Sequence, residues 1–272
     1  MNRYENIFKK LKLIKERCFI PFITIGYPSE KIFLKIIDTC VQSGADALEL
    51  GIPFSEPLSD GPIIQQSNLH ALCSGITILK CFNIIKQIRI KYFSLPIGIL
   101  IYTNMILNQK INYFYQLCQK YDIDSVLIPD LPIEEYTEFY KYAKKNNIFS
   151  ILICPPNAND SLLYNIANKG QGYIYLVSRP GVTGLINKKN YINKNIIKKL
   201  KLYHSVPIIQ GFGIYTVEQI ITSLSLGVHG VICGSVIIQL IKKYYNQEHI
   251  LIPKIKNIIK KFKNITKKKI IF

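Results

Sequence analysis

The sequence contains no Cys-x-x-Cys pair, no apolar run long enough to span a bilayer, and few acidic residues. Its cysteines are odd in number and scattered, which argues against both a disulfide framework and a zinc site. They are Cys18, Cys40, Cys73, Cys81, Cys118, Cys154 and Cys233. Charges interrupt residues 1–17 every few positions, so this segment lacks the apolar core of a signal peptide. These absences predict a cytoplasmic protein with buried, reduced thiols and no membrane association.

The shortage of acidic residues leaves a strongly basic chain. Lysine and arginine number 35 against 17 aspartates and glutamates, which gives a formal charge of +18. Such a charge could favour nucleic acid or another polyanion. Most of the basic residues are lysines, however, and they accompany many isoleucines, asparagines and tyrosines, as a coding bias toward A and T would produce. Because no arginine-rich face or nucleic-acid-binding motif accompanies the charge, we expect no nucleic-acid partner.

No linker rich in proline, glycine or serine and no strong internal repeat divides the chain. A length of 272 residues suits one large or two small domains, and 49% apolar residues can fill an extensive core. We therefore predict a single domain over residues 1–272.

Eight short apolar runs recur along the chain, with amphipathic stretches between them. The candidate strands are residues 19–25, 45–52, 97–102, 125–128, 149–154, 173–177, 206–210 and 230–233. Between the first two, apolar residues at helical spacing follow Ser29, a suitable capping residue, and this pattern predicts a βαβ crossover. Further helices are expected over residues 78–92, 113–121, 134–145, 162–168, 216–226, 237–244 and 254–269. Thr216 and Gln219 form a possible capping box at the start of the helix over residues 216–226.

Eight strands that alternate with helices predict an α/β fold, a (β/α)8 TIM barrel. The alternative is an open doubly wound sheet. That fold would carry a Gly-x-Gly-x-x-Gly turn after the first strand, and this turn is missing. An extra N-terminal helix over residues 2–17 is expected to plug or flank the bottom of the barrel.

The most informative segment is residues 49–62, where the second strand ends and a proline-rich loop begins. Working groups of such barrels lie at the carboxyl ends of the strands. Side chains alternate along a strand, so if Leu48 and Leu50 face the helices, Glu49 faces the barrel mouth. Partial burial there disfavours a charged carboxylate and moves its pKa toward the range of acid–base catalysis.

Asp60 is the second acid of this segment. Two acids that bracket one loop allow one to exchange protons while the other stays ionised. The alternative is purely structural: Glu49 forms an ordinary ion pair, and Asp60 only begins an Asp-Gly turn.

Two glycine-containing loops follow the last two strands, at residues 210–213 and 233–235. Glycines permit close backbone approach and amides at a helix start attract anions, so these loops suit a phosphate monoester. The alternative is that the glycines only form tight turns. After the sixth strand, residues 178–184 and the polar stretch up to Asn195 suit a lid that excludes water, or else a surface connection without function.

Together these segments resemble the tryptophan synthase alpha family. The family signature is similar to Glu-Leu-Gly-Ile/Val-Pro-Phe-Ser-Asp-Pro-x-x-Asp-Gly-Pro, and residues 49–62 match it except that Glu56 replaces an aspartate. Residues 127–130, 179–184, 210–213 and 234–235 also agree in order and spacing, over almost the whole chain. Pro180 is a second departure, at a position where a small polar residue is common.

The resemblance implies a retro-aldol cleavage of indole-3-glycerol phosphate to indole and glyceraldehyde 3-phosphate. Glu49 would carry both proton movements, and Asp60 would accept the indole N–H and stabilise the positive charge of the ring. Thr183 would contact Asp60 when the lid closes. The phosphate would be held by Gly184, Gly213, Gly234 and Ser235. The pocket would be lined by Phe22, Leu100, Tyr102, Leu127, Tyr175, Phe212 and Ile232, which would otherwise be interpreted as core residues.

The resemblance also implies a partner, a pyridoxal-phosphate-dependent beta subunit that receives indole through a tunnel in an alpha2-beta2 tetramer. No metal and no cofactor are expected in this chain. Glu56 is expected to alter contacts with the beta subunit, and Pro180 to stiffen the lid. None of the four histidines, His70, His204, His229 and His249, falls in a matched motif. The rival function is another phosphate-binding TIM-barrel isomerase or synthase, against which residues 49–60 discriminate.

Overall fold

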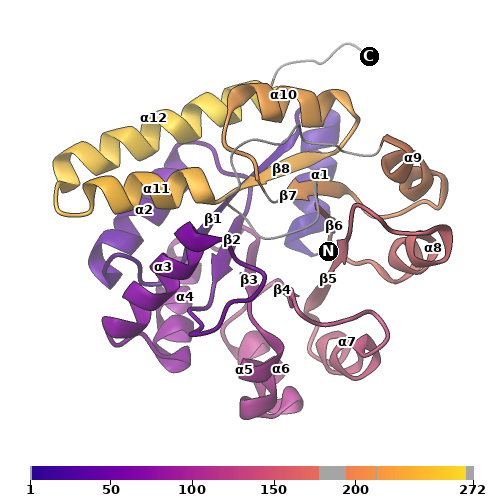
Figure 1. The fold of residues 1–272 in the computed structure, drawn as a ribbon, viewed down its shortest axis with the longest axis horizontal. Helices are drawn as coiled ribbons and strands as arrows, with labels where there is room; N and C mark the ends of the chain where they lie inside the picture. The colour runs from indigo at the N-terminus through magenta and orange to yellow at the C-terminus, as the bar shows by residue number, and fades with distance from the viewer. Residues whose placement is uncertain (1, 178–193, 212, 268–272) are drawn as a thin grey trace.

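The computed structural model describes residues 2–177, 194–211 and 213–267, and its core is a closed barrel of eight parallel strands. Each strand pairs with the next in chain order, and β8 closes on β1 (Figure 1). The strands are β1 (Cys18–Thr24), β2 (Leu48–Gly51), β3 (Ile97–Leu100), β4 (Ser125–Leu127), β5 (Phe149–Cys154), β6 (Ile174–Val177), β7 (Ile208–Gly211) and β8 (Gly230–Cys233). The predicted TIM barrel is confirmed.

Helices surround the barrel and cover the outer faces of the strands (Figure 1). They are α1 (Arg3–Leu13), α2 (Glu30–Gln42), α3 (Pro62–Cys73), α4 (Ile78–Lys91), α5 (Thr103–Gln109), α6 (Ile111–Lys120), α7 (Tyr136–Lys145), α8 (Asp160–Lys169), α9 (Lys194–Leu202), α10 (Val217–Ser225), α11 (Ser235–Tyr244) and α12 (Glu248–Lys267). The Ser29 hydroxyl caps α2, and Thr216 and Gln219 form the expected capping box at the start of α10.

Three helices were not predicted, α3, α5 and α9, and the reasons differ. The buried side of α3 includes Ser67 and Asn68 while Leu69 is exposed, so no apolar stripe marks it in the sequence. The helix α5 has only 7 residues. The helix α9 begins inside the lysine- and asparagine-rich stretch that we interpreted as loop, although it buries Ile196 and Ile197.

The terminal helices have other bounds than predicted. At the N-terminus α1 ends at Leu13 rather than residue 17, because Lys15 takes a positive φ of 58° that the helix cannot continue. At the C-terminus α12 begins at Glu248 and contains Pro253, whereas the prediction began the helix after that proline. A single proline near a helix start removes one hydrogen bond, which packing against the barrel can offset.

Apolar side chains fill two layers, one between the strands and the helices and one inside the barrel. Leu48 and Leu50 belong to the outer layer, whereas Ala47 belongs to the inner one. The alternation predicted for β2 is confirmed, and it directs Glu49 into the barrel.

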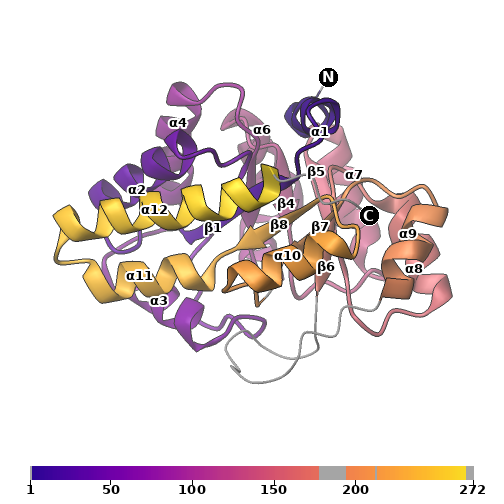
Figure 2. The same cartoon turned by 90° about the horizontal axis from the view of Figure 1, so that it is seen from above.

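The helix α1 lies across the amino-terminal end of the barrel, as expected (Figure 2). Its Tyr4 side chain is fully buried in the inner layer, where the hydroxyl lies 3.0 Å from Ser125 Oγ at the start of β4. Arg3 fixes the helix from outside through ion pairs with Asp122 and Asp124. This end of the barrel is therefore closed by side chains.

Among the described residues, no single helix has the length and apolar character needed to cross a membrane. The consecutive helices α3 and α4 meet those criteria only as a pair, and a bend of 100° separates them. Six of the cysteines are buried, but the prediction of buried thiols is wrong for Cys73, which is exposed because it ends α3 at the surface.

Candidate active site

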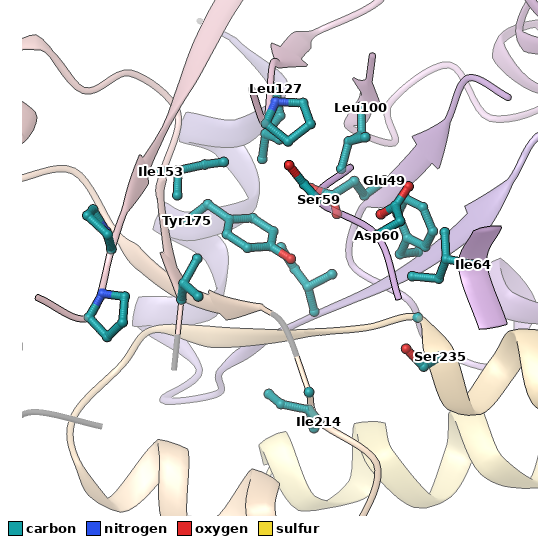
Figure 3. Close-up of a pocket in the computed structure, with 18 of the residues that line it drawn as sticks. Glu49, Ser59, Asp60, Ile64, Leu100, Leu127, Ile153, Tyr175, Ile214 and Ser235 are labelled. Atoms are coloured by element: carbon teal, nitrogen blue, oxygen red, sulfur yellow. The ribbon is translucent and has the colours of Figure 1, made fainter. Parts of the chain in front are cut away.

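A pocket of about 450 Å³ opens at the carboxyl ends of the strands, and both predicted catalytic acids line it (Figure 3). Glu49 comes from β2 and Asp60 from the loop that precedes α3. The other predicted residues around it are Phe22, Leu100, Leu127, Tyr175, Gly213, Ile232, Gly234 and Ser235. Residues from distant parts of the sequence therefore surround one cavity.

Glu49 is almost completely buried, with 2% of its surface exposed. The Tyr173 hydroxyl donates a hydrogen bond of 3.0 Å to Oε1, while Oε2 has no partner among the described residues. Burial raises the pKa of Glu49 to about 7; the Tyr173 hydrogen bond opposes this shift and the nearby charge of Asp60 adds to it. At neutral pH this carboxyl group can therefore both give and take a proton.

Asp60 is also buried, and burial raises its pKa to about 6, against hydrogen bonds from Tyr102 and Asn68 that lower it. The Asn68 amide donates to Oδ2 over 3.3 Å. The main-chain oxygen of Asp60 accepts a hydrogen bond of 2.9 Å from the Gln65 side chain. Two residues of α3 therefore hold Asp60 over the pocket.

The phosphate-binding prediction concerns the start of α11 and the loop after β7. Ser235 is the first residue of α11, where unpaired amides favour an anion. A side chain at Gly234 would bring its Cβ within 2.8 Å of Phe22 Cδ1, so only glycine leaves this approach open. Gly213 has a φ of +79°, which favours glycine. Figure 3 places Ser235 and Ile214 on one side of the pocket and Leu100 and Leu127 on the other.

Among the described residues, only Tyr102 of the predicted set does not line this pocket. The Tyr102 hydroxyl accepts a 3.2 Å hydrogen bond from the Ser59 amide and hydrogen-bonds to the Asp60 carboxylate, and its ring stacks on Phe54. Thr183, Gly184 and Phe212 lie outside the described residues, as do Arg179 and Pro180 of the expected lid.

Sequence reasoning missed Tyr173, Asn68, Ile64 and Ile153. Tyr173 precedes Tyr175 by two positions, so the alternation used for Glu49 indicates that both tyrosines face the barrel interior. Asn68 and Ile64 lie on α3, which was not predicted, and a single sequence offers no sign that they reach Asp60. Ile153 belongs to β5, where apolar residues follow one another, so the sequence does not indicate which of them face the barrel interior.

No described histidine lines the pocket. His229 lies at the opposite end of the barrel, where its Nδ1 accepts a hydrogen bond of 3.0 Å from the Ile208 amide. Within the described residues, no group of three or more histidine, cysteine, aspartate or glutamate side chains is placed to hold a metal ion.

Comparison with known proteins identifies the family. The model of the family "Tryptophan synthase alpha chain" matches residues 8–267. A tryptophan synthase alpha chain from Buchnera aphidicola subsp. Baizongia pistaciae is 51% identical over 97% of this chain and 98% of that one. Another, from Shigella sonnei, is 45% identical over 98% and 100%. The solved alpha chain from Legionella pneumophila subsp. pneumophila superposes with a TM-score of 0.87 at 27% identity, covering 98% of this chain and 97% of that one. The chain therefore belongs to the tryptophan synthase alpha chain family.

Proposed function

We propose that this chain is a carbon–carbon lyase that cleaves indole-3-glycerol phosphate to indole and glyceraldehyde 3-phosphate in the pocket between Glu49 and Ser235. The observation that carries the proposal is the position of two buried acids, Glu49 and Asp60, in one cavity with the α11 N-terminus. Family membership agrees with this activity. A phosphate-binding isomerase would need the anion site but not this pair of acids.

Glu49 begins the cycle protonated, a state that its pKa of about 7 makes available at neutral pH. It transfers the proton to C3 of the indole ring, which makes the ring cationic and leaves a carboxylate. The carboxylate then removes the proton of the adjacent glycerol hydroxyl. As the C=O bond of the aldehyde forms, the bond from C3 to the glycerol carbon breaks and its electrons neutralise the ring. Glu49 ends protonated, so the cycle is closed and uses no cofactor of this chain.

Asp60 stays ionised during this cycle and stabilises the positive charge on the ring, while it accepts the indole N–H. Its hydrogen bonds from Asn68 and Tyr102 favour the charged form, because both donate to the carboxylate. A charge that is fixed before the reaction stabilises the transition state without reorganisation.

The remaining pocket residues bind the two ends of the substrate. The apolar side chains of Phe22, Leu100 and Leu127 suit the indole ring, and Tyr175 and Ile232 suit the region between the ring and the phosphate. The amides near Gly213, Gly234 and Ser235 suit the phosphate. Thr183, Gly184 and Phe212 would complete the site on the same proposal.

The test is indole release from indole-3-glycerol phosphate by purified Glu49→Gln and Asp60→Asn variants. Glu49→Gln keeps the shape of the side chain but cannot act as an acid or a base at neutral pH, so indole release should fall by about 10³-fold or more. Asp60→Asn should lower kcat severely, by about 10²-fold. Circular dichroism checks that both variants are folded. Undiminished turnover by Glu49→Gln would contradict the proposed mechanism.

Family membership implies a beta-subunit partner. We propose that the assembly is an alpha2-beta2 tetramer, that pyridoxal phosphate resides in the beta subunit, and that the complex works in the cytoplasm. Support comes from a surface hollow beside the pocket, lined by Glu56, Leu58 and Leu69 among others. Leu58 is 78% exposed and Leu69 is 60% exposed, so this apolar surface suits a protein partner.

A further inference from the structure

The buried face of α1 is connected to Glu49 by direct contacts that no part of the proposed mechanism uses. The Tyr4 hydroxyl lies 3.0 Å from Ser125 Oγ, and the Tyr4 ring packs against the Tyr173 ring with centroids 5.5 Å apart at 59°. The Tyr173 hydroxyl in turn donates to Oε1 of Glu49. Both tyrosine side chains are 1% exposed. The contacts run through the barrel interior from its closed end to the pocket.

Tyr173 hydrogen-bonds to only one of the two carboxyl oxygens of Glu49. Because Oε1 accepts the tyrosine hydrogen, a proton carried by Glu49 is best placed on Oε2. Oε2 has no hydrogen-bond partner among the described residues. A buried polar atom without a partner is costly unless a ligand supplies one, so Oε2 is the oxygen left for the substrate.

Tyr4 limits where the Tyr173 ring can lie. Two local features fix Tyr4 itself. The Asn2 side chain caps α1 by accepting from the Tyr4 amide at 3.0 Å, and Gly98 leaves the space that the tyrosine hydroxyl occupies, since a Cβ there would lie 2.9 Å from that oxygen. The Tyr4 ring also lies 6.4 Å from Phe149, so it is enclosed on more than one side. Tyr173 therefore has a rigid neighbour on the side away from the pocket.

The geometry assigns Tyr173 as the positioning residue that fixes the Glu49 carboxyl group and leaves Oε2 to exchange the proton with substrate, with Tyr4 of α1 supporting Tyr173 from below. The inference rests on the proposed role of Glu49. It extends the active site to the N-terminal helix, which lies at the opposite end of the barrel from the substrate.

Few of the described ionisable groups face Glu49, so the effect of one hydrogen bond is measurable. Asp60 raises the pKa of Glu49, Tyr173 lowers it by hydrogen bonding, and Tyr4 interacts with its charge from the barrel interior. Tyr175 interacts electrostatically with Tyr173. Within the part of the chain that the structure describes, no lysine or arginine contributes to the shift. Loss of the Tyr173 hydroxyl should therefore raise the pKa of Glu49 further.

The experiment compares pH profiles of indole release for Tyr173→Phe, Tyr4→Leu and Tyr4→Phe. Tyr173→Phe should shift the alkaline limb of kcat/KM to higher pH and lower kcat about tenfold, with KM unchanged, because Tyr173 does not line the pocket. Tyr4→Leu removes the supporting ring and should produce a smaller shift in the same direction. Tyr4→Phe keeps the ring and should leave the profile as it is.

Tyr115→Phe is the matched control, because it removes a buried tyrosine hydroxyl from the outer layer, away from the pocket. It should lower the Tm without moving the profile. If Tyr173→Phe behaves like this control while Glu49→Gln is inactive, the inference is wrong and the proposed function stands. If Tyr173→Phe shifts the limb but Tyr4→Leu does not, the role of Tyr4 is overturned. Full activity of Glu49→Gln would instead overturn the proposed function itself.

Discussion

Glu49 and Asp60 occupy the same pocket but are suited to different protonation states. Burial raises the pKa of both, to about 7 and about 6. The mechanism needs Glu49 protonated and Asp60 ionised, so activity should fall as Asp60 gains its proton below about pH 6 and as Glu49 loses its proton above about pH 7. We predict a narrow bell-shaped dependence of kcat/KM on pH, with two apparent pKa values that belong to the pair.

The control for this profile is Asp60→Asn. The charge of Asp60 raises the pKa of Glu49, so its removal should move the alkaline limb of the residual activity to lower pH. A wild-type profile that stays flat across both limbs would contradict the assignment of the two acids.

His229 makes stability depend on pH at a residue far from the pocket. Burial, followed by the charges of Lys201, Arg17 and Lys12, lowers its pKa from 6.5 to about 4. The folded protein favours neutral imidazole. The contribution of His229 to the free energy of unfolding is therefore complete above pH 6.5 and is lost as the pH falls toward 4. By linkage this contribution amounts to up to about 3 kcal/mol. Urea unfolding at a series of pH values should show this loss.

His229→Asn is the corresponding variant, since an amide oxygen can still accept from the Ile208 amide but does not titrate. The free energy of unfolding of this variant should decline less between pH 6.5 and 4. Equal declines in the variant and the wild type would show that other groups govern acid unfolding.

Individual residues also show what the sequence could and could not predict about the site. Glu49 was placed correctly because strand alternation is a strictly local property. Tyr102 was predicted to line the pocket, but its hydroxyl bonds to Ser59 and Asp60 instead, and only the tertiary position of the loop before α3 reveals this. Asn68 was missed for the same reason: its partner is 8 residues away but on a different element.

At the scale of elements, the attachment of α1 and α4 to the barrel depends on one buried carboxylate, Asp124. It accepts hydrogen bonds from Arg89 at 2.6 Å, from Arg3 at 2.9 Å and from the Ile97 amide at 2.7 Å. Removing one partner of a buried pair leaves the other charge without compensation. Asp124→Ala should therefore lower the free energy of unfolding by about 3–5 kcal/mol, as measured in urea.

Asp160→Ala is the matched control, because its ion pair with Lys199 joins two exposed side chains on α8 and α9. This substitution should leave the urea midpoint almost unchanged. Comparable destabilisation by the two variants would mean that burial does not determine the effect of these pairs.

Elements were predicted with uneven success, and the pattern has a physical cause. The strands were found because each is a short apolar run, and α2, α4 and α11 because their apolar stripes are clear. The helices α3 and α9 were missed because one buries polar residues and the other follows a long polar stretch. Helix ends proved harder still, as the proline within α12 shows.

At the scale of the whole molecule, the barrel was predictable because eight strand–helix alternations leave few topologies, and the closure of β8 on β1 follows from that count. The formal charge of +18 added little to this inference, because charge determines association rather than fold. That residues 1–272 form a single domain stays a prediction.

Assembly is also a property of the whole molecule, and the exposed apolar surface beside the pocket makes it testable. Leu69 lies on α3 and is 60% exposed in the hollow that also contains Glu56. We predict that Leu69→Glu weakens binding of a beta subunit about tenfold or more, because a charge would have to be buried in an apolar contact.

Leu202→Glu is the control: Leu202 is 70% exposed at the end of α9, on a different side of the barrel from α3 in both views (Figures 1 and 2). Sedimentation of each variant with the beta subunit measures the complex, and indole release by the isolated chain should be equal in both. Equal binding by the two variants would exclude this surface as the contact.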